Sequence, residues 1–263
     1  MFKKYRSLFL ILVGLVVLPG QASASDFAKE KRWADDIVDA LIDGEAVWLT
    51  ADQHKFLGIY TQTQDKNIKG AAIVLHGIGV HPNWPEVVYP LRVRLTERGW
   101  QTLSLQMPIL RNGAEYDEYK PLFGEIAPRI NAAIAFLKSK GIKNIVIIGH
   151  SLGSTMASYY LATNKAPEVS ALVAIGVSGT QFSDPALGYF SSVTRIKIPI
   201  LDIYGTDDIE PVLSSATRRA AIARESGNNR YTQVVVKGAN HFFSGKDDPL
   251  VKQVGDWLDK TLN

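Results

Sequence analysis

Residues Asn144–Ala157 have the sequence NIVIIGHSLGSTMA, which contains the pattern that most strongly indicates the fold. It starts as the apolar run 145–148, continues as G-x-S-x-G around Ser151, and ends in a segment compatible with a helix. This order is typical of the nucleophile elbow, a sharp turn between a strand and a helix that lifts a serine hydroxyl clear of the sheet. Gly149 and Gly153 are steric requirements, because side chains at either position would collide across so tight a turn. The pattern predicts that Ser151 is a nucleophile.

A serine nucleophile needs a base and an acid, and after an elbow these follow along the chain in the order acid, then histidine. Residues 198–204 predict a buried strand, and Asp207 and Asp208 follow just after it. Residues 231–236 predict a further strand, and His241 lies beyond its end. Open α/β sheets place their sites at the carboxyl ends of their strands. We therefore expect His241 to accept the serine proton and an aspartate to orient its imidazole.

An oxyanion hole requires two backbone N–H donors, one from the residue after the nucleophile and one from the loop after an early strand. The first is Leu152, and residues 70–75 predict the early strand. In the loop that follows it, Ile78 is the expected second donor, because Gly77 and Gly79 let the backbone turn its N–H inward. Both donors are main-chain groups, so the identity of their side chains carries little information.

Neither a metal nor a cofactor is expected. His76 and His81 lie in no spacing typical of a zinc site, and the chain has no cysteine that could complete one. The absence of cysteine also excludes a disulfide framework and a lipidated N-terminal cysteine.

Two longer segments resemble a family of exported bacterial alpha/beta hydrolases that is known mainly as a domain of unknown function. They are HGIGVHPNWP at residues 76–85 and GWQTLSLQMP at residues 99–108. The resemblance extends from about Phe56 to the C-terminus, and these motifs are far more specific than G-x-S-x-G. The resemblance implies the alpha/beta-hydrolase fold and a serine hydrolase, and it supplies no substrate.

The resemblance also bears on the choice of acid. Hydrolases of this kind usually carry strand-G-x-x-D, which selects Asp208 over Asp207 when the spacing is counted from Gly205. An aspartate pair after a strand is otherwise typical of a solvated turn whose first member caps the next helix. We expect Asp207 to be this cap and Asp208 to be the acid, with Glu210 and Asp184 as further alternatives.

The first 24 residues have the three parts of a secretory signal peptide. Lys3, Lys4 and Arg6 precede the apolar run Leu8–Leu18, and residues 22–24 form an A-x-A cleavage site. The run is too short for a stable transmembrane helix. We expect cleavage after residue 24, which leaves residues 25–263 as one domain.

Cleavage changes the charge of the chain and the partners it is expected to have. Removing three positive charges and no negative charge lowers the formal net charge from +3 to about 0. The mature chain then has no basic excess to attract nucleic acid or an anionic membrane. We expect an exported protein, periplasmic if the source has two membranes and otherwise secreted, whose partner is a small-molecule acyl substrate.

The rest of the chain alternates predicted strands with helical segments, which favours a mostly parallel central sheet with helices on both faces. The expected strands are 46–50, 56–62, 70–75, 101–106, 144–148, 170–177, 198–204 and 231–236, and the expected helices are 33–41, 86–98 and 121–140. About twenty residues separate 177 from 198, which leaves room for one helix near 185–193 and little or no cap domain. We expect a fairly open site. Residues 115–119 (EYDEY) either border this site or form a solvated connection, and we favour the solvated connection because such loops are usually polar surface.

Two classes of function fit these residues. The first is a serine hydrolase that cleaves an ester, thioester or amide through an acyl-enzyme on Ser151, or an acyltransferase that uses the same residues with an alcohol in place of water. The second is a non-catalytic binding protein that keeps the fold. The presence of the serine, the aspartate pair and the histidine favours the enzyme.

Overall fold

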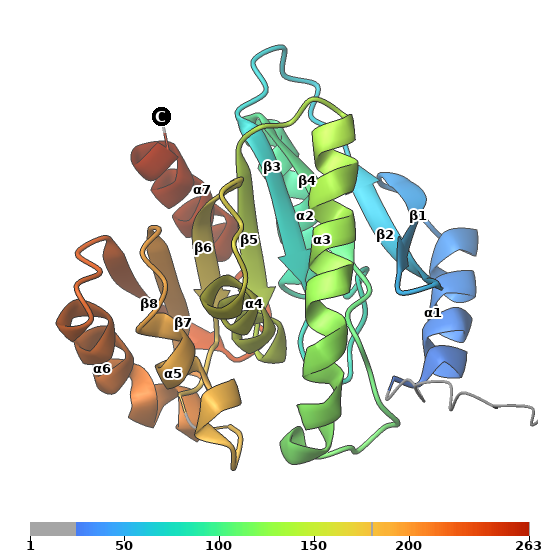
Figure 1. Ribbon diagram of the computed structural model, residues 1–263. Helices are drawn as coiled ribbons and strands as arrows, with labels where there is room; N and C mark the ends of the chain where they lie inside the picture. Colours follow the sequence, from blue (N-terminus) through green and yellow to red (C-terminus); the bar gives the residue numbers. More distant parts are fainter. Residues whose placement is uncertain (1–24, 180, 263) are drawn as a thin grey trace, which may run out of the picture.

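A computed structural model describes residues 25–179 and 181–262 (Figure 1), and the expected signal peptide lies outside them. A central sheet of eight strands has the order β1-β2-β4-β3-β5-β6-β7-β8. The strands are β1 (Glu45–Ala51), β2 (His54–Thr61), β3 (Gly70–Leu75), β4 (Trp100–Leu105), β5 (Ile145–His150), β6 (Val169–Ile175), β7 (Ile200–Asp207) and β8 (Tyr231–Asn240). Only the β1–β2 and β2–β4 pairs are antiparallel, so the prediction of a mostly parallel sheet is confirmed.

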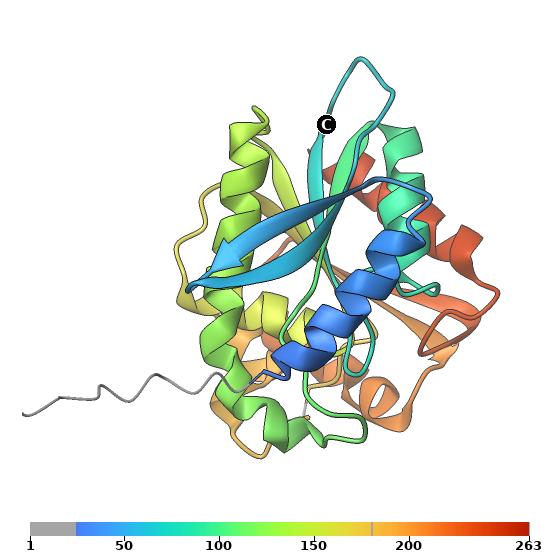
Figure 2. The same ribbon diagram turned by 90° about the vertical axis from the view of Figure 1, so that its right-hand side faces the viewer.

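Helices cover both faces of the sheet, as predicted (Figures 1 and 2). One face carries α1 (Phe27–Asp39), α2 (Val88–Arg94) and α7 (Asp247–Leu262). The other carries α3 (Phe123–Ser139), α4 (Leu152–Thr163), α5 (Tyr189–Val193) and α6 (Glu210–Glu225). Three short 3-10 helices complete the described elements: η1 (Leu95–Arg98), η2 (Tyr116–Leu122) and η3 (Pro185–Leu187). Among the described helices, none combines the length and apolar character needed to cross a bilayer.

The central strands are apolar throughout because both of their faces are buried. Ile73 and Ile147 pack on the side of α3 and α4. Ala72 and Ile148, one position along in each strand, belong to the opposite core beneath α2 and α7. Between β6 and β7, where a cap domain could be inserted, the described residues form only η3 and α5. The single helix expected near residues 185–193 is therefore divided at Gly188 into two short elements.

A buried ion network fixes β7, β8 and α6 to one another. Asp202 of β7 is fully buried and accepts a hydrogen bond from Arg219 Nε of α6 (2.8 Å). It also accepts hydrogen bonds from the Tyr231 hydroxyl (2.5 Å) and Gln233 Nε2 (2.9 Å), both on β8. The predicted acid and histidine directly follow β7 and β8. This network therefore fixes the two strands that position these residues.

A second buried network ties α1 to α3 and to the end of β4. Arg129 of α3 donates hydrogen bonds to both carboxylate oxygens of Glu30 (3.0 and 2.9 Å) and to the carbonyl oxygen of Gln106 (2.8 Å). It also contacts Glu125 at 3.3 Å, and the backbone nitrogen of Ser25 lies 3.2 Å from the same carboxylate. Figure 2 shows α1 beside the β1–β2 hairpin, where Ala34 and Ile37 of α1 pack with apolar residues of β2.

The buried ring of His76, directly after β3, joins the loops that follow β3 and β4. Its Nε2 accepts the Met107 N–H (3.0 Å), so the proton is assigned to Nδ1, which donates to the Gly77 carbonyl oxygen (2.8 Å). Burial lowers the pKa of His76 to about 3. The folded protein therefore keeps this imidazole neutral, and it remains able to accept the Met107 hydrogen bond.

We predict that His76 makes the fold less stable in mild acid. Below about pH 6.5 the unfolded imidazole binds a proton that the folded ring, with a pKa of about 3, does not bind. The free energy of unfolding therefore falls as the pH falls toward 3, by about 1.4 kcal/mol per pH unit for this one group. Urea denaturation of the parent and of His76→Gln across this range measures the effect. The variant should show a slope that is shallower by about one proton, and equal slopes would contradict the prediction.

Candidate active site

Ser151 lies at a sharp turn between β5 and α4, where the sequence places the elbow. Its backbone has φ 52° and ψ −119°, a conformation that costs energy for any residue other than glycine. A Cβ added to Gly149 would lie 2.5 Å from Ser154 N, and one added to Gly153 would lie 2.5 Å from the His76 carbonyl oxygen. Both glycines are therefore required by close contacts of the backbone.

Hydrogen bonds fix the turn to the end of β6. The Ser151 N–H donates to the Ile175 carbonyl oxygen (2.8 Å). The Ser154 hydroxyl donates to the Gly149 carbonyl oxygen (2.6 Å) and accepts the Ile175 N–H (3.0 Å). These bonds hold the strained conformation of Ser151 in place.

The structure brings Asp208 and His241 together. Asp208 Oδ1 lies 2.6 Å from His241 Nδ1 and also accepts the Ile209 N–H (2.8 Å). The Asp208 side chain is 0% exposed and that of His241 is 11% exposed. A carboxylate can only accept, so the proton of the imidazole is on Nδ1 and Nε2 is left as an acceptor.

The alternative acids do not contact His241. Asp207 is exposed at the end of β7 and accepts the Thr206 hydroxyl (2.9 Å). The expectation that Asp207 caps the next helix is wrong, because Asp207 still belongs to the strand, and α6 has Ile209 at its N-cap with no side-chain hydrogen bond. Asp184 caps η3, and Glu210 is exposed at the start of α6.

Ser151 and His241 approach the same point of the sheet, at the end of β6. The Ser151 N–H is bonded to Ile175, and a Cβ added to the next residue, Gly176, would lie 3.1 Å from the His241 ring. His150 lies against His241 with ring centroids 5.0 Å apart and donates from Nε2 to the His241 carbonyl oxygen (2.9 Å). Burial lowers the pKa of His150 to about 4, so this neighbour is neutral at neutral pH and places no charge beside His241.

The loop that carries Ile78 runs past Ser151. A Cβ added to Gly77 would lie 3.1 Å from Ser151 Cβ, so the loop is in contact with the nucleophile. Leu152 opens α4, where the first N–H groups of a helix have no partner within it and form its positive end. Among the backbone hydrogen bonds of the described turns, loops and helix caps, none has the Ile78 N–H or the Leu152 N–H as its donor.

The sequence did not predict a role for Tyr116, although its segment was one candidate for the border of the site. The Tyr116 hydroxyl lies 3.2 Å from Ser151 Oγ. Among the described residues, Ser151 Oγ forms this hydrogen bond with Tyr116 and forms none with His241. The expectation of a solvated connection over residues 115–119 holds for the three exposed acidic residues and is wrong for the tyrosines. Tyr119 is 1% exposed, and Tyr116 borders the site through its contact with Ser151. Ser151 itself is 1% exposed. The three-residue spacing of Tyr116 and Tyr119 was the available signal, because it places both on one face of a 3-10 helix.

The two histidines considered for a metal serve the fold. His76 joins two loops, as described above. The His81 ring lies edge-on to Trp33 and Trp84, at 5.4 Å from each, and its Nδ1 accepts the Asn83 N–H (3.2 Å). In the part of the chain that the structure describes, no group of three or more His, Asp or Glu side chains is arranged to hold a metal ion.

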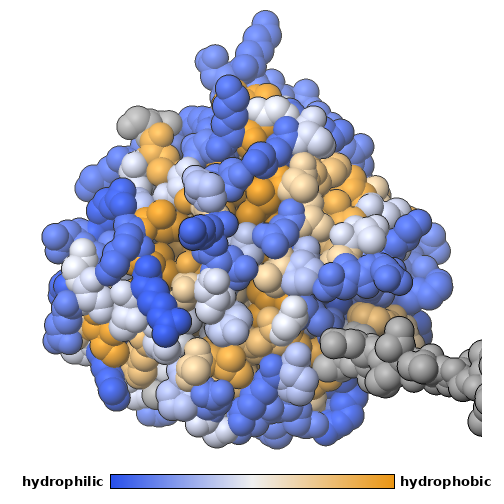
Figure 3. Space-filling model, in the orientation of Figure 1, coloured by the Kyte–Doolittle hydropathy of each residue, from blue (hydrophilic) through white to orange (hydrophobic). Residues whose placement is uncertain are grey.

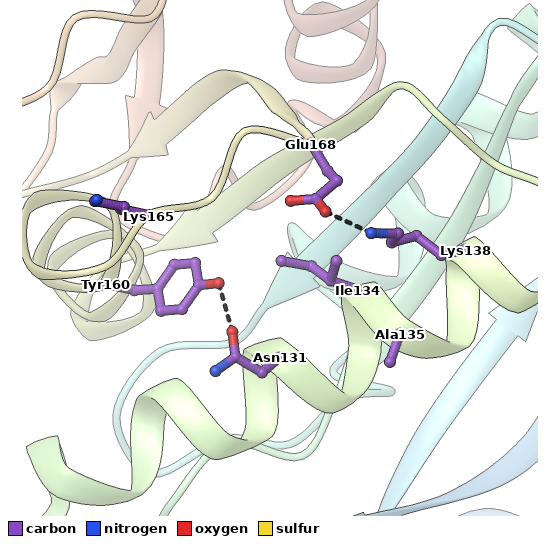
Figure 4. A pocket seen from close by; sticks show the side chains of 7 residues that line it. All are labelled: Asn131, Ile134, Ala135, Lys138, Tyr160, Lys165 and Glu168. Carbon is purple, nitrogen blue, oxygen red and sulfur yellow. Dashed lines mark hydrogen bonds and ion pairs between the residues drawn. The ribbon is translucent and has the colours of Figure 1, made fainter.

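A separate pocket of about 480 Å³ lies between α3 and α4 (Figure 4). Its lining residues are Asn131, Ile134, Ala135, Lys138, Tyr160, Lys165 and Glu168. Lys138 pairs with Glu168 (2.5 Å), and the Tyr160 hydroxyl donates to Asn131 (2.7 Å). Glu168 directly precedes β6, so the pocket lies toward the amino end of that strand, away from Ser151 at the carboxyl end of β5.

Similarity to known proteins extends over most of the chain. The family described as "Protein of unknown function (DUF3530)" matches residues 21–122 and 114–260. A Mycoplasma genitalium protein provisionally named esterase/lipase 3 is 29% identical over 118 residues, or 44% of this chain. The chain spans 40% of the length of that relative.

Solved structures share the fold. A protein of unknown function from Agrobacterium tumefaciens, provisionally described as an alpha/beta hydrolase, is 25% identical with a TM-score of 0.66 over 83% of this chain and 96% of that one. The Pyrococcus furiosus esterase Pf2001 is 18% identical with a TM-score of 0.67 over 86% and 94%. Est1E from Butyrivibrio proteoclasticus is 15% identical with a TM-score of 0.64 over 82% and 98%. This chain therefore has the alpha/beta-hydrolase fold and belongs to the DUF3530 family.

Proposed function

We propose that the protein is a serine hydrolase that cleaves an ester, thioester or amide through an acyl-enzyme on Ser151. The observation that carries this proposal is the 2.6 Å contact between Asp208 and His241 beside a serine held in the strained elbow conformation. The esterase names of the Pyrococcus furiosus structure and the Mycoplasma genitalium relative agree with it. Ile209 and Leu213, exposed just after Asp208, provide apolar surface that suits the acyl part of a small-molecule substrate.

The residues divide the chemistry between them. His241 Nε2 takes the proton of Ser151 Oγ as the oxygen attacks the substrate carbonyl, and Asp208 stabilises the imidazolium that forms. The N–H groups of Ile78 and Leu152 stabilise the oxyanion, and one such donor typically contributes about 10²–10³ to the rate. His241 then gives its proton to the leaving group, and water repeats the sequence to release the acid.

Acyl transfer is the second candidate function. It uses the same residues, with an alcohol in place of water as the group that attacks the acyl-enzyme. The observation that favours it is the exposure of Ser151, only 1%, because a nucleophile shielded from bulk water loses less acyl group to hydrolysis. A binding protein that retains the fold is the alternative without catalysis.

We further propose that the mature protein begins at Ser25 and is exported. The Ser25 nitrogen lies 3.2 Å from Glu125 Oε1, and its hydroxyl lies 2.6 Å from Oε2. Arg129 also contacts this carboxylate, 3.3 Å from Glu125 Oε2. Cleavage after residue 24 would turn the Ser25 nitrogen into a positively charged amino group, which would form an ion pair with the Glu125 carboxylate.

The first prediction from this proposal concerns the mature terminus. Intact-mass measurement on exported protein should give the mass of residues 25–263, because the A-x-A site directs cleavage after residue 24. A full-length chain held in the inner membrane would mean that the N-terminal segment is an anchor.

The second prediction concerns the nucleophile. Ser151→Ala should abolish labelling by a fluorophosphonate probe and reduce ester turnover to the residue left by binding and the oxyanion hole, about 10³–10⁴ over water. Ser158→Ala, on the same helix but bonded to the Ser154 carbonyl oxygen, is the matched control and should label like the parent. Undiminished labelling of the Ser151 variant would show that the reactive serine lies elsewhere.

The third prediction concerns the acid. Asp208→Asn keeps the shape of the side chain but favours the wrong imidazole tautomer, a change that costs about 10⁴ in turnover in serine proteases. Asp207→Asn alters an exposed residue that does not touch His241, so its turnover should stay within about twofold of the parent. Turnover and melting temperature of the two variants decide the assignment. A collapse of activity in the Asp207 variant alone would reverse it.

A further inference from the structure

Tyr116 contacts the atom that would react. Its hydroxyl lies 3.2 Å from Ser151 Oγ, which is otherwise buried. The tyrosine opens η2, and its ring lies edge-on to Phe182 with centroids 5.8 Å apart. Phe182 in turn contacts Phe123 at the start of α3 (5.1 Å). Packing as well as hydrogen bonding therefore holds the phenol over the serine.

The neighbours of Tyr116 decide which way its proton points. Thr155 of α4 donates from its hydroxyl to Gln181 Oε1 (3.2 Å), which turns the amide nitrogen of Gln181 toward Tyr116. Gln181 Nε2 then donates to the Tyr116 oxygen (3.0 Å). Because an amide nitrogen can only donate, the phenol oxygen accepts from Gln181 and its own proton is left for Ser151 Oγ.

The phenol stays protonated under working conditions. Burial raises the pKa of Tyr116 above its ordinary value, and the hydrogen bond with Ser151 opposes this shift without reversing it. Tyr116 is therefore a neutral donor at neutral pH. With its oxygen accepting from Tyr116, Ser151 keeps its own proton free for the Nε2 of His241.

We propose that Tyr116 is a catalytic residue whose hydroxyl donates a hydrogen bond to Ser151 Oγ and stabilises the negative charge that this oxygen acquires. The proposal rests on the proposed function. In acylation the Oγ–H bond breaks and its proton goes to His241 Nε2, an Oγ–C bond forms, and the carbonyl π electrons move to the carbonyl oxygen. Tyr116 keeps its proton throughout.

This contact is stronger in the transition state than in the resting enzyme. Hydrogen bonds to a charged oxygen are about twice as strong as those to a neutral oxygen, so Tyr116 stabilises Oγ most while its proton is leaving. The same holds in deacylation, when Oγ departs from the acyl group. The Ile78 and Leu152 N–H groups act on the carbonyl oxygen instead, so Tyr116 supplies a separate contribution at the nucleophile.

The test is Tyr116→Phe, which removes one oxygen and keeps the ring. The kcat for 4-nitrophenyl acetate and the rate of fluorophosphonate labelling should both fall about 10- to 100-fold. KM should change by less than about threefold and the melting temperature by less than about 2 °C, because the packing remains. Tyr159→Phe is the matched control, since its ring contacts Phe123 from α4 (4.9 Å), and it should react like the parent.

A second variant keeps the tyrosine. Gln181→Met removes the donor that orients the phenol, so the labelling rate should fall by about threefold or more at an unchanged KM. Labelling of both the Tyr116 and Gln181 variants at the parental rate would overturn the role of Tyr116 and leave the proposed function standing. A parent protein that neither labels nor hydrolyses esters would overturn both proposals.

Discussion

The backbone conformation at Ser151 is the constraint on which the rest of this structure depends. A non-glycine residue with φ 52° persists only when its surroundings over-determine it. Here β5 enters the turn from the centre of the sheet and α4 leaves it packed against the same sheet. Gly153 meets the His76 carbonyl oxygen so closely that even a Cβ would not fit. The elbow is therefore also the point where α4 reaches the loop after β3, which carries Ile78.

The same parallel sheet brings distant residues to this turn. Asp208 and His241 are separated from each other by 33 residues, yet they meet because β7 and β8 end at one edge of the sheet. The buried Asp202 network joins these two strands to α6 behind them. Figure 3 shows the molecular surface in the orientation of Figure 1, and on the described part of this face apolar residues alternate with hydrophilic ones. The polar interactions that position the site lie beneath that surface.

Sequence reasoning located the residues that follow strand ends, because such positions are marked locally. The apolar run before Gly149 and the β-branched run before His241 each predict a strand. In a parallel sheet, functional residues lie just beyond the carboxyl ends of the strands. The prediction that Asp207 is a helix cap was wrong because β7 continues to Asp207, three residues beyond the predicted end of the strand at residue 204. The role of Tyr116 was missed for a different reason. Its contact with Ser151 crosses 35 residues and depends on how η2 packs against Phe182, which no local pattern encodes. The Arg129–Glu30 ion pair could not be predicted either, because its two residues are 99 positions apart in the sequence and no local pattern links them.

Mapping the fluorophosphonate adduct on the parent protein shows whether Ser151 is the nucleophile. Tryptic cleavage at Lys143 and Lys165 releases the peptide Asn144–Lys165, which contains Ser151, Ser154 and Ser158. Tandem mass spectrometry of this peptide can assign the phosphonyl group to one serine. We predict one adduct per chain, on Ser151 and on no other residue. An adduct on a different serine, or a folded protein that forms none, would contradict this prediction.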